Sequence, residues 1–192
     1  MLLRGLLLGL LLIATLAEAG VADIAARLQQ PAVLHGRFVQ QKHMAVLAVP
    51  LVSQGAFTVV RDHGVIWQTE KPLASRLLIN KDGIRGADIG DSRAMAYIGN
   101  ILHAILSGDL SALEQQFEIA ASSSENRWQL QLVPRSSLLK KAIMAIELQG
   151  DQHIRQLQLQ EAGGDRTDIV FSAFVPADTA DDGLLHEFAA GP

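Results

Sequence analysis

Alternation of apolar and polar residues is the feature that most restricts how this chain of 192 residues can fold. One polar residue separates Trp128 from Leu130 and Leu130 from Leu132, and one also separates Leu157 from Leu159. In a strand, side chains at i and i+2 share a face, so these segments have one apolar and one polar face. The pattern is typical of an antiparallel sheet that is covered on one side. Strands are predicted over residues 33–43, 54–60, 65–69, 75–80, 117–119, 128–132, 142–149, 156–160 and 167–174.

Two segments repeat apolar residues with helical spacing instead, and a shorter third helix follows them. The longest segment carries Ile98, Leu102 and Ile105 on one stripe. Gly108 is suited to end this helix, and Asp109 is suited to begin the next one. Helices are predicted over residues 22–30, 92–107 and 110–115. So little helix leaves room for a hollow between a long curved sheet and its cover, unless a tightly curled sheet fills that space itself.

The N-terminus has the three parts of a secretory signal: Arg4, an apolar run, and small residues at Ala17 and Ala19. The apolar run has about 13 residues, whereas about 20 are needed to span a bilayer. We therefore expect residues 1–19 to be a cleaved signal peptide. A single domain is expected over residues 20–176, followed by a loose acidic tail over residues 177–192.

Composition excludes several classes of function. The chain has no cysteine, which rules out disulfides, thiolate metal sites, a cysteine nucleophile and a lipidated mature N-terminus. A net charge of −4 argues against nucleic acid as a partner. The protein is therefore expected to be exported and soluble.

Motifs for catalysis are almost absent. The sequence has no H-E-x-x-H, G-x-S-x-G or P-loop pattern, and its histidines are interpreted as surface or edge residues. Ser137 and Lys140 match S-x-x-K, but the companion motifs S-D-N and K-T-G are missing, so an exposed strand or turn is favoured there. Residues 83–86 are interpreted as a turn between strands. We expect no catalytic residue, no metal and no cofactor. The six histidines are His35, His43, His63, His103, His153 and His186.

Arg61 is the strongest single candidate for a functional side chain. It follows Phe57 and Val59 at strand spacing, so a continuing strand would place its charge on the apolar face. A buried charge needs partners, and carbonyl groups of a covering helix could provide them. In the alternative interpretation the strand ends at Val60 and Arg61 begins a turn that faces water.

The loop at residues 44–52 is almost entirely apolar, although hairpin tips are normally polar. Either it folds over the edge of the core, or it is an exposed tip that contacts lipid or a partner. The candidate contact residues are Met44, Val46, Leu47, Val49 and Leu51.

Several of these features together resemble one known family. F-V-Q-Q-K at residues 38–42, Gly55 with Arg61 and Trp67, and Lys71-Pro72 follow the pattern of the periplasmic outer-membrane lipoprotein carrier (LolA) family. The resemblance is specific over residues 33–84 and more general downstream. The aromatic-rich strand that often follows D-G and the family's C-terminal F-x-F-x-P-P-x-G signature are both missing here. These differences suggest a divergent branch.

The resemblance implies a fold that is mainly β with an α lid (α+β), in which a curved antiparallel sheet forms an incomplete β-barrel around an apolar cavity. It implies a monomeric periplasmic carrier of acylated lipoprotein or another acyl lipid, served by an inner-membrane donor transporter and an outer-membrane acceptor. Arg61 matches an arginine that bonds the lid and holds the empty cavity shut. Expected cavity residues are Phe38, Phe57, Val59, Trp67, Leu77, Ile79, Ile98, Leu102, Ile105, Trp128, Leu130 and Leu132.

Two other functions remain open at this point. The cargo could be a pigment or glycolipid, because side branches of the family are linked with export of other lipids. Alternatively, the same fold could serve a non-transporting lipid sensor or adaptor. A hydrolase using Ser137 and Lys140 is the least favoured possibility.

Overall fold

The computed structural model describes residues 20–80, 83–86 and 93–189, with side chains at 93–99 excepted. The expected signal peptide, residues 1–19, lies outside this range. Within it, ten strands form one antiparallel sheet in the order β5-β4-β3-β2-β1-β10-β9-β8-β7-β6. The strands are β1 (Val33–His43), β2 (Leu51–Val60), β3 (Gly64–Lys71), β4 (Ser75–Asn80), β5 (Gly83–Gly86), β6 (Phe117–Ser123), β7 (Trp128–Pro134), β8 (Ile143–Gly150), β9 (Ile154–Glu161) and β10 (Arg166–Ala177).

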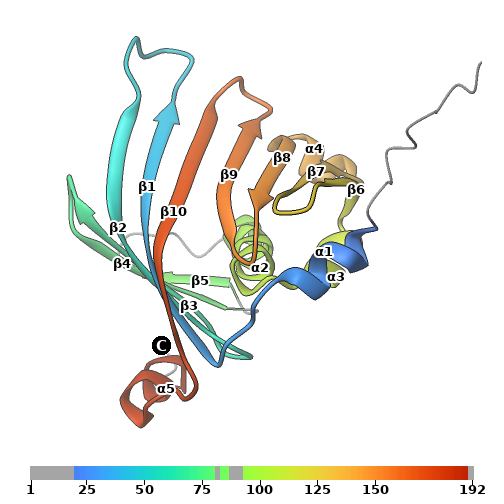
Figure 1. Cartoon of the computed structure of the whole chain (residues 1–192). Helices are drawn as coiled ribbons and strands as arrows, with labels where there is room; N and C mark the ends of the chain where they lie inside the picture. Colours follow the sequence, from blue (N-terminus) through green and yellow to red (C-terminus); the bar gives the residue numbers. More distant parts are fainter. Residues whose placement is uncertain (1–19, 81–82, 87–92, 190–192) are drawn as a thin grey trace, which may run out of the picture.

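The sheet is strongly curved but does not close into a barrel, because β5 and β6 stand at its two ends and do not pair (Figure 1). Helices lie along the gap between these ends. α2 packs on β2 to β5, α3 packs on α2 and β6, and α1 contacts both α3 and β6. The prediction of a mainly β fold with few helices and an unclosed antiparallel sheet is confirmed. The helices are α1 (Val21–Arg27), α2 (Arg93–Ser107), α3 (Leu110–Glu114), α4 (Ser137–Lys140) and α5 (Asp182–Ala189).

Local signals explain where the covering helices begin and end. Gly108 has φ +72°, a conformation that favours glycine, and its N–H donates to the carbonyl of Ile105 to close α2. The Asp109 side chain accepts from the N–H of Ala112 and caps α3, as predicted. Among the described residues, no helix is long and apolar enough to cross a membrane.

Three segments differ from their predicted structure. Residues 83–86 form the edge strand β5 rather than a turn, because they pair with β4. Ser137–Lys140 forms the short helix α4, which the Ser136 side chain caps by accepting from the N–H of Leu139. Part of the tail that was expected to be loose forms α5, in which Leu184, Leu185 and Phe188 are half-buried.

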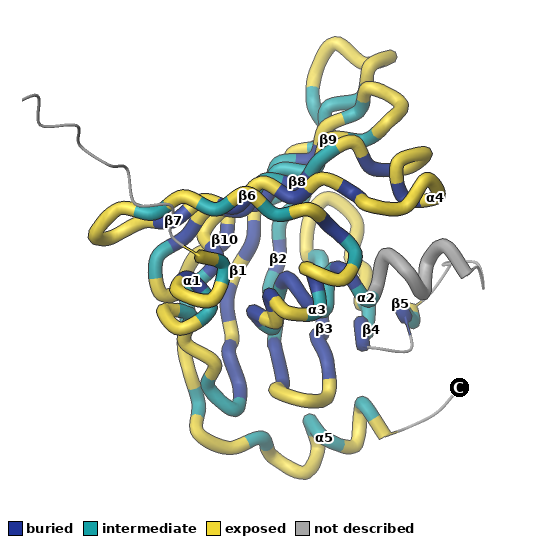
Figure 2. The backbone as a smooth tube through the Cα atoms, turned by 90° about the vertical axis from the view of Figure 1, so that its right-hand side faces the viewer, coloured by how far each residue is buried: buried dark blue, intermediate teal, exposed yellow. Residues whose placement is uncertain are grey.

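α5 docks on the outside of the sheet below β4 (Figures 1 and 2). Glu187 forms an ion pair with Arg76, and the carbonyl of Phe188 accepts from Arg85. The Phe188 ring also lies 6.1 Å from the His63 ring. The apolar stripe of a short helix therefore finds partners that the sequence pattern alone does not reveal.

Antiparallel order sorts the hairpin loops onto two edges of the sheet. The β1–β2, β3–β4, β7–β8 and β9–β10 loops share one edge, called here the upper edge because most of it is at the top of Figure 1. The β2–β3, β6–β7 and β8–β9 turns share the opposite, lower edge. α5 follows β10 at that lower edge.

Candidate functional site

The inner face of the curved sheet is apolar, as the alternation predicts. Side chains from both halves of the sheet and from α2 form one contiguous cluster. Leu77 and Leu102 are half-buried against it, and Ile98 lies at a position whose side chain is outside the described part of the chain. The predicted cavity residues that are fully buried in this cluster are Phe38, Phe57, Val59, Trp67, Ile79, Ile105, Trp128, Leu130 and Leu132.

Aromatic rings fill the middle of this face. Phe38 stacks on Trp67 with ring centroids 3.8 Å apart, and Phe171 meets Phe57 edge-to-face at 5.5 Å. Gly36 lies directly beside the Phe57 ring, where any side chain would collide with it. The lack of a side chain at Gly36 therefore makes room for the Phe57 ring beside β1.

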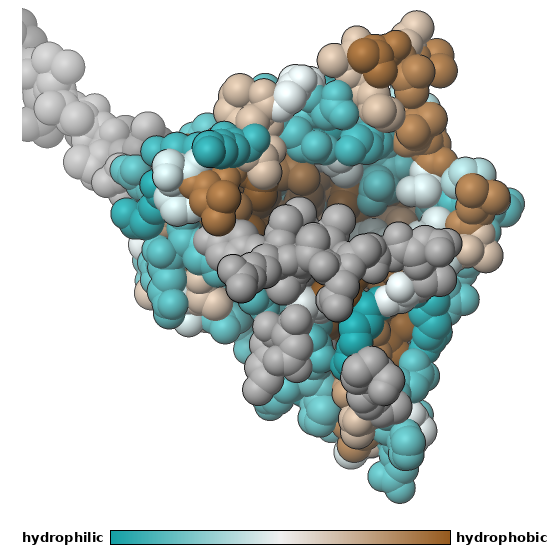
Figure 3. Space-filling view, turned by 180° about the vertical axis from the view of Figure 1, so that it is seen from behind, coloured by the Kyte–Doolittle hydropathy of each residue, from teal (hydrophilic) through white to brown (hydrophobic). Residues whose placement is uncertain are grey.

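The described side chains line a cavity of about 30 Å³ near the lower edge. That volume suits about one or two water molecules. The predicted hollow beneath α2 stays a prediction, because the side chains at 93–99 of that helix lie outside the described part of the chain. Figure 3 shows apolar residues set back in a recess on the rear of the molecule, beside residues drawn in grey. The cavity is lined by Leu28, Gln29, Leu34, Phe57, Leu106, Ser107, Gly108, His153, Ile154, Phe171 and Phe174.

Arg61 does not continue the apolar face of β2. The strand ends at Val60, and Arg61 is exposed in a turn in which Asp62 has φ +64°. The inward orientation is therefore wrong for this structure, and the alternative turn interpretation is confirmed. A turn at the end of a strand breaks the two-residue period that the inward orientation assumed.

The end of α2 and the start of α3, which cover the sheet, nevertheless lie next to this turn. Arg61 borders a surface depression of about 290 Å³ together with His103, Ser107 and Asp109, which belong to the last turns of α2 and the start of α3. The backbone N–H of Arg61 donates to the carbonyl of Ala32 at 2.9 Å. The sequence therefore identified the right neighbourhood for this residue but not its direction.

The apolar loop at residues 44–52 is exposed at the upper edge. Val46 is 83% exposed and Val49 is 71% exposed, Leu47 and Leu51 are also exposed, and Met44 is half-buried. The N–H of Ala45 donates to the Asp165 side chain in the β9–β10 loop, which holds the two loops together. The loop does not fold over the core.

Two further apolar side chains at the same edge escaped the sequence analysis. Leu73 in the β3–β4 loop is 80% exposed, and Leu138 in α4 is 71% exposed. Lys71, Lys140 and Lys141 are exposed near them. The available signal was an apolar residue in each segment between two predicted strands. Only the strand order shows that these turns share an edge with residues 44–52.

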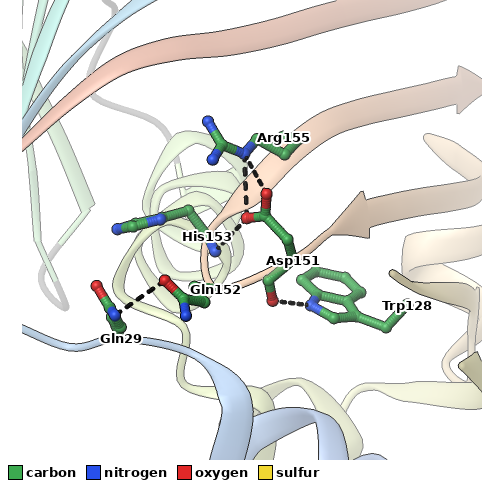
Figure 4. Close-up of polar contacts among 6 residues, drawn as sticks. All are labelled: Gln29, Trp128, Asp151, Gln152, His153 and Arg155. Atoms are coloured by element: carbon green, nitrogen blue, oxygen red, sulfur yellow. Dashed lines mark hydrogen bonds and ion pairs between the residues drawn. The ribbon is translucent and has the colours of Figure 1, made fainter. Parts of the chain in front are cut away.

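A polar cluster occupies the lower edge at the turn between β8 and β9 (Figure 4). The Asp151 carboxylate accepts from the backbone N–H of His153 at 3.0 Å and from Nε of Arg155 at 2.9 Å. Burial works to raise the pKa of Asp151, but these hydrogen bonds and the charge of Arg155 bring it below its usual value. The Asp151 carbonyl accepts from the Trp128 indole at 2.6 Å.

Two histidines differ from their predicted surface role. Nδ1 and Nε2 of His153 and Nε2 of His103 are buried and have no hydrogen-bond partner among the described residues. Burial lowers the pKa of both imidazoles below 6.5. The His153 ring stacks on Phe174 with centroids 4.5 Å apart. A histidine in a polar-looking turn gave no signal that its ring would be buried.

The unclosed sheet, its helical cover and its apolar inner face define the class of incomplete β-barrels with an apolar interior. A family model described as outer membrane lipoprotein carrier protein LolA matches residues 29–185. The chain therefore belongs to the LolA family, as its sequence motifs predicted. No curated protein sequence matches it.

Solved structures are similar to this chain at low sequence identity. A LolA superfamily protein from Nitrosomonas europaea has 8% identity and a TM-score of 0.48, with 85% of this chain and 94% of that chain covered. The complex of MucA and MucB from Pseudomonas aeruginosa gives 15% identity and a TM-score of 0.50, with 86% and 60% covered. At these identities the likeness concerns the fold alone.

Proposed function

We propose that this chain is a periplasmic carrier, without enzymatic activity or cofactor, that shields acyl chains of a lipid or lipoprotein between the inner and outer membranes. The supporting observation is one contiguous apolar cluster on the concave face beneath α2, in a chain of the LolA family. Exposing a ~16-carbon chain to water costs on the order of 10 kcal/mol, at about 0.8 kcal/mol per methylene. An enclosed apolar face removes most of that cost.

In this proposal, α2 moves during loading. The small cavity near the lower edge is by itself far smaller than an acyl chain needs, and α2 packs on β2 to β5 over the apolar cluster. The work of moving α2 reduces the net affinity and allows the carrier to release its cargo. The arrangement with α2 packed on the sheet is therefore proposed as the closed state.

We infer that Arg61 stabilises the closed state from outside the core. It borders the last turn of α2, where helix carbonyls lack helical partners and a positive charge is favoured. The proposed latch therefore acts at the C-terminal end of the lid helix rather than inside the cavity.

The upper edge is proposed to contact the membrane during transfer. Val46, Val49, Leu73 and Leu138 present apolar side chains there, with lysines nearby. Apolar side chains that insert beside basic ones suit an anionic lipid surface. The donor transporter and the outer-membrane acceptor implied by the family remain part of the proposal, as does a monomeric state.

Mass spectrometry of lipid extracted from the exported protein tests the carrier role. We expect acylated lipid in stoichiometric amounts, and less of it from Leu77→Gln, because Leu77 packs against the inner cluster. Val170→Gln is the control, since Val170 is exposed on the outer face of β10, away from both the inner cluster and the upper-edge loops. Protein free of lipid in every preparation would contradict the proposal.

A second candidate is an adaptor that binds a signalling protein with the same fold. One structural neighbour, MucB, was solved as a complex with MucA, and its fold covers most of this chain. A stable protein complex that survives purification without lipid would favour the adaptor over the carrier.

A further inference from the structure

His153 is the one residue lining the small cavity whose side-chain polar atoms are buried with no hydrogen-bond partner among the described residues. Both of its ring nitrogens are buried and unpartnered. Gln29 already donates to the Gln152 side chain at 3.0 Å, and the Ser107 hydroxyl already donates to the His103 carbonyl at 2.7 Å. Most of the remaining lining is apolar. Buried polar groups in folded proteins normally have partners, so this imidazole requires an explanation.

The imidazole is held firmly in place. Asp151 anchors its backbone N–H, and Arg155 donates to the same carboxylate. The ring stacks on Phe174 at an interplanar angle of 19°, and the Arg155 guanidinium lies 4.7 Å from the centre of that Phe174 ring. Figure 4 shows the His153 ring directed away from Asp151 and Arg155. The ring is therefore oriented by its surroundings and not by a partner of its own.

A bulge in β10 supplies the Phe174 platform. Ala173 has φ +51°, and the register between β1 and β10 shifts at this point, where His35 faces Val175 and Arg37 faces Ser172. The extra residue places Phe174 against the same apolar cluster as Phe171. A strand bulge with a strained residue is often found where a side chain is redirected toward a binding site.

The chemistry around His153 in the small cavity limits which kind of ligand group it can bind. Burial and the charge of Arg155 lower the pKa of His153, while Asp151 opposes them, so the ring is neutral near pH 7 and offers one N–H donor. A neutral donor suits a neutral acceptor. On an acyl lipid, the ester or amide carbonyl is such an acceptor, and it sits where the apolar chain meets the polar head.

We propose that His153 donates a hydrogen bond to the ester or amide carbonyl of an acyl chain whose hydrocarbon lies in the apolar interior. This inference rests on the proposed carrier function and specifies its cargo. Acyl lipids joined through an ester or amide are bound in preference to pure hydrocarbons or polyenes of the same length. In this proposal His153 forms a hydrogen bond with the carbonyl, and the aromatic cluster packs against the hydrocarbon of the acyl chain.

The test measures displacement of a fluorescent apolar probe, 1-N-phenylnaphthylamine, from the full chain by methyl palmitate and by heptadecane. We expect methyl palmitate to bind about tenfold more tightly, as one buried hydrogen bond allows. His153→Phe keeps the stacking surface and should abolish this preference, while His153→Gln keeps an N–H donor and should retain part of it. Ser107→Ala is the matched control in the same cavity and should leave the preference intact.

Each other outcome is decisive. Equal loss of both ligands in His153→Phe would show a purely structural role and overturn the inference. Tighter binding of palmitic acid than of its methyl ester would assign the site to carboxylates instead. Wild-type protein that binds both ligands equally would refute the His153 role but leave the carrier function standing, whereas failure to bind either ligand would refute both.

A measurement on the wild-type chain avoids dependence on variants that fold. Imidazole ¹⁵N NMR should show a change in the His153 N–H signal on adding methyl palmitate and none on adding heptadecane. An identical response to both ligands would also overturn the inference.

Discussion

The two edges of the sheet depart from ordinary burial in opposite directions. The upper edge exposes apolar side chains such as Val46 and Leu73, whereas the lower edge buries the ring nitrogens of His153, for which no described residue provides a hydrogen-bond partner. Between them lies an ordinary apolar core. Both departures cost free energy in the isolated protein, and we propose that a lipid offsets each of them: a membrane would cover the exposed apolar tips, and an acyl carbonyl would accept from the buried donor. The contrast suggests one edge for contact and the other for recognition.

The largest expected effect is a difference in unfolding free energy between a substitution in the core and one at the upper edge. Phe57→Ala removes a buried ring that contacts several others and should lower the free energy of unfolding by about 3–5 kcal/mol. Val49→Ala, at an exposed apolar site, should change it by less than about 0.5 kcal/mol. Urea unfolding measures both variants. Similar losses of unfolding free energy in the two variants would contradict the distinction between the core and the upper edge.

Charges at the upper edge should weaken membrane contact without unfolding the protein. Val46→Asp combined with Val49→Asp should reduce binding to vesicles of anionic lipid by about tenfold or more, because two apolar contacts are lost and like charges repel. Val175→Asp, at an exposed valine near the end of β10, is the matched control. A large fall in melting temperature would show instead that the loop belongs to the core.

The free energy of unfolding should fall at acid pH because of two histidines with buried ring nitrogens near the lower edge. Burial lowers the pKa of both His153 and His103. At His153, the charge of Arg155 lowers the pKa further and Asp151 opposes the shift. At His103, Asp109 and Asp62 oppose the shift. The unfolded chain takes up these protons near pH 6.5 and the folded chain only at lower pH. Their contribution to stability is therefore complete above pH 6.5 and falls as pH drops toward the lowered folded pKa values.

Urea unfolding at pH 7.5 and pH 5 measures this dependence. His153→Phe and His103→Gln should each reduce the loss of stability between the two pH values. His186→Gln, at an exposed histidine of α5, provides the comparison. A loss that is unchanged in both buried-site variants would assign the acid sensitivity to other groups.

The smallest expected effect concerns the latch at Arg61. Arg61→Leu should leave folding nearly intact, since the side chain is exposed, but should alter lid opening and slow the release of bound lipid by a few-fold. Arg61→Lys keeps the charge beside the end of α2 and should behave more like the wild type. Transfer between vesicles measures the rate, and unchanged rates in Arg61→Leu would remove the latch from the proposal.

Much of the fold followed from local patterns. Trp128, Leu130 and Leu132 are all buried because alternation reflects the geometry of a strand directly. Asp109 and Gly108 marked helix boundaries because capping depends on neighbouring backbone groups. β5 was missed because a four-residue strand is stabilised mainly by its pairing with β4, which a local pattern does not contain.

The candidate site was predictable only in part. The apolar composition of residues 44–52 was visible, but their exposure alongside Leu73 and Leu138 depends on which loops share an edge. Phe174 turns inward only because of the bulge at Ala173. The direction of Arg61 depended on where β2 ends, and two-residue periodicity does not specify a strand's last residue.

Sequence by itself therefore determined that this chain forms a one-sided antiparallel sheet with few helices, in the family of periplasmic lipoprotein carriers. Alternation, capping residues and family motifs act over short distances, and they survive in the linear order of residues. Only the tertiary structure decided that apolar tips gather at the upper edge, and that the ring nitrogens of His153 are buried with no hydrogen-bond partner in the described part of the chain. Those properties arise from contacts between residues far apart in the chain, such as Trp128 with Asp151 and Ala45 with Asp165.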